Sequence, residues 1–217
     1  MAAIPSTDVT FWLTTGVPTT YTMNSAPTQG DPTAISVTTG DGADGDLVVI
    51  TETNWSSVDK PQIISGYSTS GFDALGCDST RETDTAQAGK VALYTAEDMT
   101  KICPSGFTDN TNTPSAISVA TFCDPQASIP GSVVDAGTVE LTGYVDACDP
   151  SYIALYDSYE SQDQRYLRIN LGEDQGYLVM PVTALSMNWD IPLEGAVSFT
   201  LSMVKGSATR HLFGPCP

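Results

Sequence analysis

The chain has 217 residues, of which 26 are acidic and 8 are basic, so its formal net charge is −18. This excess of acids excludes nucleic-acid recognition through a row of phosphate contacts. The N-terminal stretch lacks the basic start and apolar run of a signal peptide, and no run reaches the length of a membrane span.

Short strands separated by turn residues are expected along most of the chain. Pro occurs 14 times and Gly 18 times, and turn clusters recur about every ten residues, which is typical of a mainly β protein. The first part of the chain predicts strands at residues 9–14, 34–38, 47–51, 62–67, 91–94 and 117–122. Residues 23–32 and 99–114 lack a hydrophobic period, so we expect loops there, the second a long loop over about residues 99–115.

The C-terminal part carries the clearest strand patterns. Apolar and polar residues alternate over 138–145, 165–171 and 197–203, which predicts strands with one buried face. Residues 177–187 are apolar on both faces, as in a central strand. Pro181 cannot donate to a ladder, which favours either an edge strand or a bulge at this residue.

One short α-helix is predicted at about residues 149–161. Asp149 suits the N-cap and Pro150 the first helical position. Apolar and aromatic residues then recur at helical spacing: Tyr152, Leu155, Tyr156 and Tyr159. A helix of this length is not stable alone, so we expect its aromatic stripe to pack on a sheet.

No group of residues predicts an enzyme. His211 is the only histidine, so a catalytic triad would depend on it alone, and no phosphate-binding or dinucleotide-binding glycine pattern is present. Carboxylate pairs of a glycosidase are conceivable, but aromatic residues make up only 8% of the chain. The acidic turn at 41–46 lacks the residue order of a calcium loop. We expect no catalytic residue, no cofactor and no metal.

The cysteines are expected to be free thiols. There are five, Cys77, Cys103, Cys123, Cys148 and Cys216, at irregular spacings and without a C-x-x-C pair, which disfavours a zinc site. In a reducing cytosol such thiols stay unpaired. If a bridge forms later, Cys103 and Cys123 are the first pair to test.

The C-terminal half also has a characteristic order of elements. A strand at 138–144, a polar link at 145–150, a helix, a strand at 165–171, a turn at 172–176, the segment 177–189 and a last strand at 195–206 follow one another. Upstream, residues 72–82 look like the stretch "D-x-T, then D-S/T-T-x-R/K-E", although Ala74 and Leu75 depart from its commonest spelling. Over roughly residues 63–206 the chain resembles the major tail tube proteins of long non-contractile-tailed (siphovirus-type) bacteriophages.

The resemblance implies a single tail tube domain over residues 1–217, a β-sandwich or partial barrel with one flanking helix, long loops and an N-terminal arm over about residues 1–15. Six copies would form a ring, rings would stack into a tube, and inner strands of the copies would join into one barrel. Genomic DNA would pass through the lumen without specific binding, helped by the shared negative charge.

Partners and location also follow from the resemblance. Besides copies of itself, the chain would meet the tape measure protein, the tail terminator and the distal tail protein. It would be made in the host bacterial cytoplasm and end in the tail of the virion. A β-sandwich binding module, either a virion decoration or a carbohydrate-recognising domain, is the alternative function.

Two segments are candidate contacts between copies or rings. Phe11 and Trp12 place two aromatic rings near the N-terminus, which either a neighbour or the chain's own sandwich must cover. The second candidate is a charged turn: Asp78, Thr80, Arg81 and Glu82. Arg81 and Glu82 could pair across a boundary, and a solvated turn explains them equally well.

Overall fold

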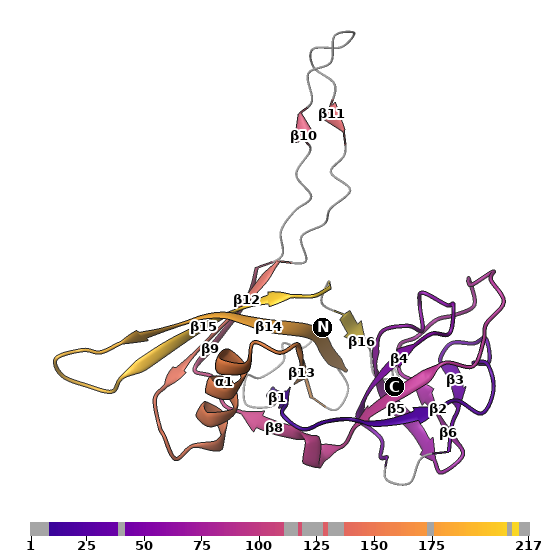
Figure 1. Cartoon of the computed structure of the whole chain (residues 1–217), viewed down its shortest axis with the longest axis horizontal. Helices are drawn as coiled ribbons and strands as arrows, with labels where there is room; N and C mark the ends of the chain where they lie inside the picture. Colours follow the sequence, from indigo (N-terminus) through magenta and orange to yellow (C-terminus); the bar gives the residue numbers. More distant parts are fainter. Residues whose placement is uncertain are drawn as a thin grey trace.

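The computed structural model describes residues 9–38, 42–110, 117–118, 128–129, 137–172, 176–207 and 210–212. These residues form a mainly β fold with one α-helix, as the sequence predicts. A sheet of eight strands and a sheet of six strands lie side by side (Figure 1). A separate two-stranded ladder joins β10 (Ile117–Ser118) and β11 (Ser128–Ile129).

The eight-stranded sheet combines strands from both ends of the chain. Its order is β8-β1-β13-β14-β15-β12-β9, with β16 beside β14, and every pair is antiparallel. The strands are β1 (Thr10–Thr14), β8 (Met99–Ile102), β9 (Gly106–Asn110), β12 (Thr138–Tyr144), β13 (Arg165–Asn170), β14 (Tyr177–Asp190), β15 (Ser198–Lys205) and β16 (Arg210–Leu212). The alternating patterns of the C-terminal half therefore predicted three of these strands correctly.

This sheet curls until its two ends approach each other. Phe11 of β1 and Phe107 of β9 lie near opposite ends of the strand order, yet their ring centroids are 5.4 Å apart. The inward side chains of the alternating strands fill the space between: Leu13, Val139, Leu141, Leu167, Ile169, Met180, Val182, Leu201 and Met203. We call this sheet with its core the half-barrel.

Residues 99–110 were expected in a long loop and instead contain β8 and β9. Each strand is short and offers only one or two inward apolar residues, such as Ile102 and Phe107, which is too few to show a period in the sequence. They become strands because β1 and β12 supply the ladders. Residues 111–115 lie outside the described residues.

Pro181 lies in the middle of the half-barrel, because β13 pairs with β14 on one side while β16 and β15 share the other. The carbonyl of Pro181 accepts a hydrogen bond of 2.9 Å from Gly206 on this second side. The missing N–H therefore falls in the gap between the β16 and β15 ladders, where no donor is needed. The bulge lies farther along, between Ala184 and Ser186. Both expectations for Pro181, an edge strand or a bulge at this residue, are wrong.

The predicted helix is present as α1 (Pro150–Ser161). The Asp149 side chain caps it by accepting a hydrogen bond of 2.9 Å from the first turn. Tyr152 and Tyr159 pack against the core of the half-barrel, whereas Tyr156 is exposed. The helix contacts β8 and β14. In the described part of the chain, no helix is long and apolar enough to cross a membrane.

The six-stranded sheet is inserted between two neighbouring strands of the half-barrel. Its order is β2-β7-β4-β5-β6-β3. The strands are β2 (Thr19–Thr22), β3 (Thr33–Ser36), β4 (Leu47–Thr51), β5 (Pro61–Ser68), β6 (Gly71–Ala74) and β7 (Lys90–Tyr94). Thr14 at the end of β1 pairs directly with Met99 at the start of β8. Residues 15–98, which we call the insert, thus leave and rejoin the half-barrel at one point.

The insert has a core of its own, and it also packs against the half-barrel through a separate apolar contact. Its core includes Val37, Val48, Ile50, Val58, Val91 and Leu93, all buried. At the contact, Leu47 and Ile63 of the insert pack with Val179 and Leu212 of the half-barrel, and all four are fully buried. The insert therefore covers the outer face of β13 and of the first half of β14.

Candidate assembly surfaces

The insert covers the outer face of only one part of the half-barrel and leaves the outer face of the remaining strands open. This open layer consists of β9, β12, β15 and residues 183–190 of β14. Two rows of directly paired residues cross its four strands: Thr108–Glu140–Ser202–Ser186 and Gly106–Thr142–Thr200–Asn188. None of these residues is buried. Along these two rows the outer face is a polar surface of hydroxyl, amide and carboxylate groups, and Val204 and the exposed Tyr144 lie on the same face beside them.

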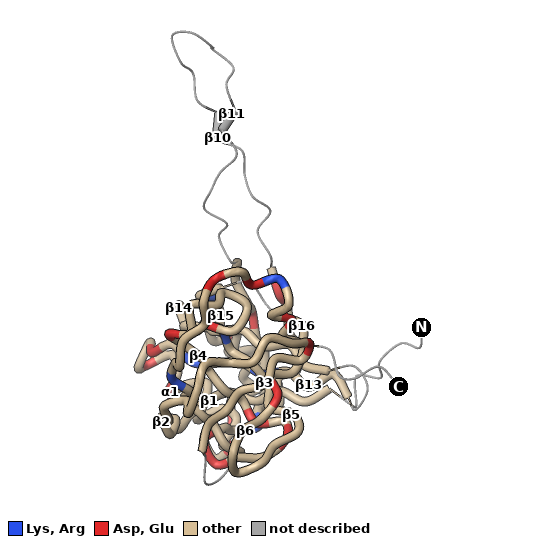
Figure 2. The backbone as a smooth tube through the Cα atoms, turned by 90° about the vertical axis from the view of Figure 1, so that its right-hand side faces the viewer, with Lys and Arg blue, Asp and Glu red and all other residues tan. Residues whose placement is uncertain are grey.

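The outer face of the open layer carries acids and no cations. Glu140 and Asp190 lie on it, and acidic residues outnumber basic ones over the described body as a whole (Figure 2). All eight Lys and Arg residues of the chain are among the described residues, and none lies on this face. Lys205 of β15 points to the opposite side, where its buried ammonium lies 2.5 Å from Asp109. Phosphate groups would find no cationic partner on this face.

An exposed aromatic cluster lies where α1 meets the β14–β15 hairpin, which extends away from the insert (Figure 1). The rings of Tyr159 and Trp189 are 6.3 Å apart in an edge-to-face arrangement, and Tyr152 contacts Phe199 at 5.5 Å. Trp189 nevertheless remains 43% exposed, and Leu193 in the hairpin connection is fully exposed. Apolar surface gathered in this way indicates an interaction site.

The chain itself covers Phe11 and Trp12, which the sequence marked as a possible contact. β1 is an interior strand between β8 and β13. Phe11 faces the core and Phe107, whereas Trp12 faces the insert, with the guanidinium of Arg168 at 5.3 Å from its ring. Arg168 also donates to the carbonyl of Gly45, so it ties the insert to the half-barrel. Residues 1–8 of the expected arm lie outside the described residues.

The charged turn over residues 78–82 is held by its own contacts. Asp78 accepts a hydrogen bond of 2.9 Å from the backbone of Thr80, and Glu82 accepts one of 2.7 Å from the backbone of Ser57. The hydroxyl and then the backbone N–H of Thr80 lower the pKa of the Asp78 carboxyl, and the contact with Ser57 lowers the pKa of the Glu82 carboxyl. Arg81 is exposed, and among the described residues it makes no ion pair within 4 Å. Arg81 and Glu82 therefore do not pair within the chain.

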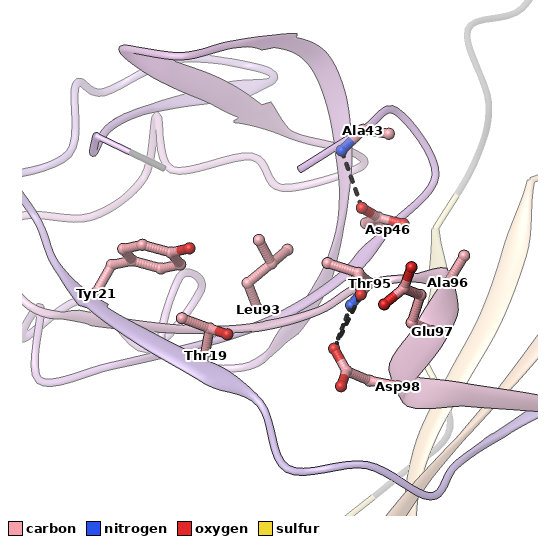
Figure 3. Close-up of a pocket in the computed structure, with 9 residues that line it drawn as sticks. All are labelled: Thr19, Tyr21, Ala43, Asp46, Leu93, Thr95, Ala96, Glu97 and Asp98. Carbon is pink, nitrogen blue, oxygen red and sulfur yellow. Dashed lines mark hydrogen bonds between the residues drawn. The ribbon is translucent and has the colours of Figure 1, made fainter. Parts of the chain in front are cut away.

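A pocket of about 590 Å³ lies in the insert, next to the segment where the chain returns to the half-barrel (Figure 3). It is lined by Thr19, Tyr21, Ala43, Asp46, Leu93, Thr95, Ala96, Glu97 and Asp98. Two of its three acids bind backbone: Asp46 accepts from Ala43 and Asp98 from Thr95, both at 2.9 Å. Burial raises the pKa of Asp46. No cluster of three or more metal-ligating side chains occurs within the described ranges. Asp46 and Asp98 therefore hold turns in place.

The acidic turn at 41–46 likewise uses its carboxylates internally. Asp44 accepts a hydrogen bond of 2.7 Å from the backbone of Tyr67, and Asp46 closes the turn on Ala43. Asp41 lies outside the described residues. These hydrogen bonds within the chain account for the carboxylates of Asp44 and Asp46, so no bound ion is needed to explain them.

Three cysteines are described, and all are free thiols. Cys77 is buried, whereas Cys103 and Cys148 are exposed. Burial raises the pKa of the Cys77 thiol. Cys123 and Cys216 lie outside the described residues, so the suggested pair of Cys103 and Cys123 stays a prediction.

Comparison with known proteins defines no family for this chain. No protein-family model matches the sequence, and no curated protein matches it. Among solved structures, the chain is similar to the tail of an empty GTA particle, computed with helical refinement in C6 symmetry. The TM-score is 0.40 and the identity 13%, over 54% of this chain and 87% of that chain. A similarity at this level carries no argument about what the chain does.

Proposed function

We propose that the chain is a structural protein, not an enzyme, whose copies assemble into the tube of a phage-type tail. The observation that carries the proposal is the open layer, a four-stranded sheet whose outer face is polar and acidic and bears no cation. The resemblance of the sequence to tail tube proteins supplies the ring of six copies and the stacking of rings.

The open layer suits the wall of a channel. Six copies with four strands each would give about 24 strands, and a spacing of about 4.8 Å gives a circumference of about 115 Å, before strand tilt widens it. Barrels of 16–18 strands already leave an aqueous channel. A barrel of this size would enclose a lumen wide enough for a large cargo.

The polar face of the open layer suits DNA as that cargo. Glu140 and Asp190 repel phosphate, and the hydroxyl rows offer no charge to hold it. The insert packs on the other half of the half-barrel, so it would lie on the outside of the tube. In this arrangement the tape measure protein, tail terminator and distal tail protein are the further partners, and the virion tail is the location.

Electron microscopy of the purified chain tests the assembly. We expect rings or tubes of uniform width. A monodisperse monomer at high concentration, without rings or tubes, contradicts the proposal.

A labelling experiment tests which face lines the channel. In a background with Cys103, Cys123, Cys148 and Cys216 replaced by Ser, Thr200→Cys on the open layer and Thr69→Cys in an exposed turn of the insert are each labelled with a bulky maleimide. Both thiols should react in the unassembled protein, and only that at position 69 should react quickly in tubes. Equal reaction of the two in tubes would show that the polar face is outside.

A binding module is the second candidate function. The insert favours it, because its six strands enclose a separate core and it joins the half-barrel at one point. Affinity for glycans in a monomeric protein would select this function over the tube.

A further inference from the structure

We propose that α1 and the end of the β14–β15 hairpin form a surface that binds a segment of another protein, one in which Lys or Arg residues flank apolar side chains. We call it the docking surface, and its exposed apolar members are Ile153, Tyr156, Trp189, Ile191 and Leu193. The inference goes beyond the proposed function, because the partner is not a copy of the chain.

Exposed large apolar side chains concentrate on this surface. Among the described residues there are eight of them, and five form the docking surface. The other three, Val17, Tyr144 and Leu185, lie outside it. α1 packs against both β8 and β14, so the fold holds the helix beside the hairpin and still leaves these five side chains exposed. Such a concentration marks a contact with another molecule.

Aromatic contacts make the surface continuous between the helix and the hairpin. The ring of Tyr159 lies 6.3 Å from that of Tyr156 on one side and 6.3 Å from that of Trp189 on the other. The indole nitrogen of Trp189 also donates to the hydroxyl of Tyr152 at 3.4 Å. Because these rings already support one another, they lose little freedom when a partner binds, which suits the anchors of an interface.

Carboxylates border these apolar side chains. Four exposed acids lie on α1 and in the hairpin connection: Asp157, Glu160, Asp190 and Glu194. A hydrogen bond with the Glu160 side chain raises the pKa of the Tyr156 hydroxyl, so this acid lies directly beside the rings. Residues 145–164 and 177–204 contain no Lys or Arg. The helix and the hairpin therefore offer apolar groups and negative charge together.

Two basic residues lie in strands next to α1, and both are directed elsewhere. Lys101 of β8 is paired with Trp12, whose side of the strand faces the insert. Arg165, which follows α1, donates to the carbonyl of Thr14 at 3.0 Å and to the hydroxyl of Ser161 at 3.4 Å. A partner that approaches the docking surface thus meets carboxylates.

Charge and aromatic content select the occupant. The carboxylates repel nucleic acid and anionic lipid, whereas Lys and Arg side chains can pair with them and also pack over the Tyr and Trp rings. A second copy offers few such groups, because only four of its basic residues are exposed: Lys60, Arg81, Lys90 and Lys101. Of these, Lys90 already pairs with Glu52 at 2.8 Å. A different, basic protein is the better match.

Peptide binding to the unassembled full chain tests the inference. The probe is a synthetic amphipathic peptide with Leu on one face of its helix and Lys on the other. Calorimetry should show binding that weakens as salt is added. The same peptide with Glu in place of Lys is the control and should not bind.

Apolar substitutions locate the site. Ile191→Ser combined with Leu193→Ser should weaken binding of the Lys peptide by about tenfold, because two side chains that the partner would cover are lost. Val17→Ser changes an exposed apolar residue of the insert and should leave the affinity unaltered.

Charge substitutions give an independent readout. Asp157→Asn combined with Glu160→Gln should weaken binding by about fivefold and reduce its dependence on salt. Asp84→Asn combined with Glu97→Gln removes the same charge from exposed positions of the insert and should have no effect.

Three results overturn the inference: no binding of the Lys peptide, equal binding of the Glu peptide, or equal weakening by the substitutions on the insert. A fourth concerns assembly. If the unmodified chain forms tubes and the Ile191 and Leu193 double variant does not, a second copy occupies the docking surface. That result refutes the basic partner and leaves the proposed function standing, whereas an unmodified chain without rings or tubes refutes only the proposed function.

Discussion

Asp46 and Arg168 are charged residues that folding places at the junction of the insert and the half-barrel. Asp46 is 8% exposed, and burial raises the pKa of its carboxyl, although its bond to Ala43 and the charge of Arg168 act in the opposite direction. Burial lowers the pKa of Arg168. Desolvation is therefore the dominant effect on both groups, and their contacts offset only part of it.

Replacement of Asp46 by Asn should stabilise the unassembled protein more at pH 7 than near pH 3.8, the ordinary pKa of the carboxyl. The folded state binds the proton more tightly than the unfolded state, so the carboxylate costs stability that grows as the pH rises through the folded pKa. Urea unfolding of both proteins at the two pH values measures this difference. An effect that does not change with pH contradicts the assignment.

At the scale of elements, the β14 bulge and the α1 cap decide which side chains reach the core. Before the bulge Met180, Val182 and Ala184 face inward, and after it Met187 and Trp189 do. The bulge takes up one extra residue, so the inward set changes from even-numbered to odd-numbered residues.

Deletion of Leu185 should leave the protein folded, because it removes the extra residue of the bulge and keeps Ala184, Ser186 and Met187 opposite Met203, Ser202 and Leu201. Deletion of Asn188 is the contrasting variant, and it should destabilise the fold because it turns Trp189 to the outer face. Circular dichroism and urea unfolding compare the two. Equal stability of the two deletion variants would mean that the bulge does not set the register.

Asp149→Ala should lower the free energy of unfolding by about 1 kcal/mol, because the first turn of α1 loses its acceptor. Asp157→Ala, at an exposed position of the same helix, should change it by no more than about 0.5 kcal/mol. Equal effects in urea unfolding would rule out the cap as the cause.

At the scale of the whole molecule, the insert and the open layer occupy separate halves of the half-barrel. One half is covered within the chain by Leu47 and Ile63, and the other presents a polar face between two strand edges. A protein that completes its sheet with a neighbour needs such a division, because the edges must stay accessible while the remaining apolar surface is buried.

Arg81→Glu tests the charged turn of the insert as a contact between copies or rings. Because Glu82 is engaged by Ser57 and Arg81 is exposed, the guanidinium is the group available to a neighbour. The substitution should slow tube growth, followed by light scattering. Lys90→Glu makes the same charge change elsewhere on the insert and should leave growth unaltered; equal rates for Arg81→Glu and the unmodified chain mean a solvated turn.

The sequence by itself determined the elements whose signals are local. α1 follows from its cap, its first-turn proline and the helical spacing of its aromatic residues, and β12, β13 and β15 follow from alternation within each strand. Tertiary structure decided what depends on distant partners. β8 and β9 exist because β1 and β12 offer ladders, and Pro181 is tolerated because two strands meet opposite it. Phe11 and Trp12 are partly buried because β1 lies between β8 and β13. Long-range pairing of this kind leaves no period in a short segment, so only the folded chain shows which strand edges remain for a neighbour.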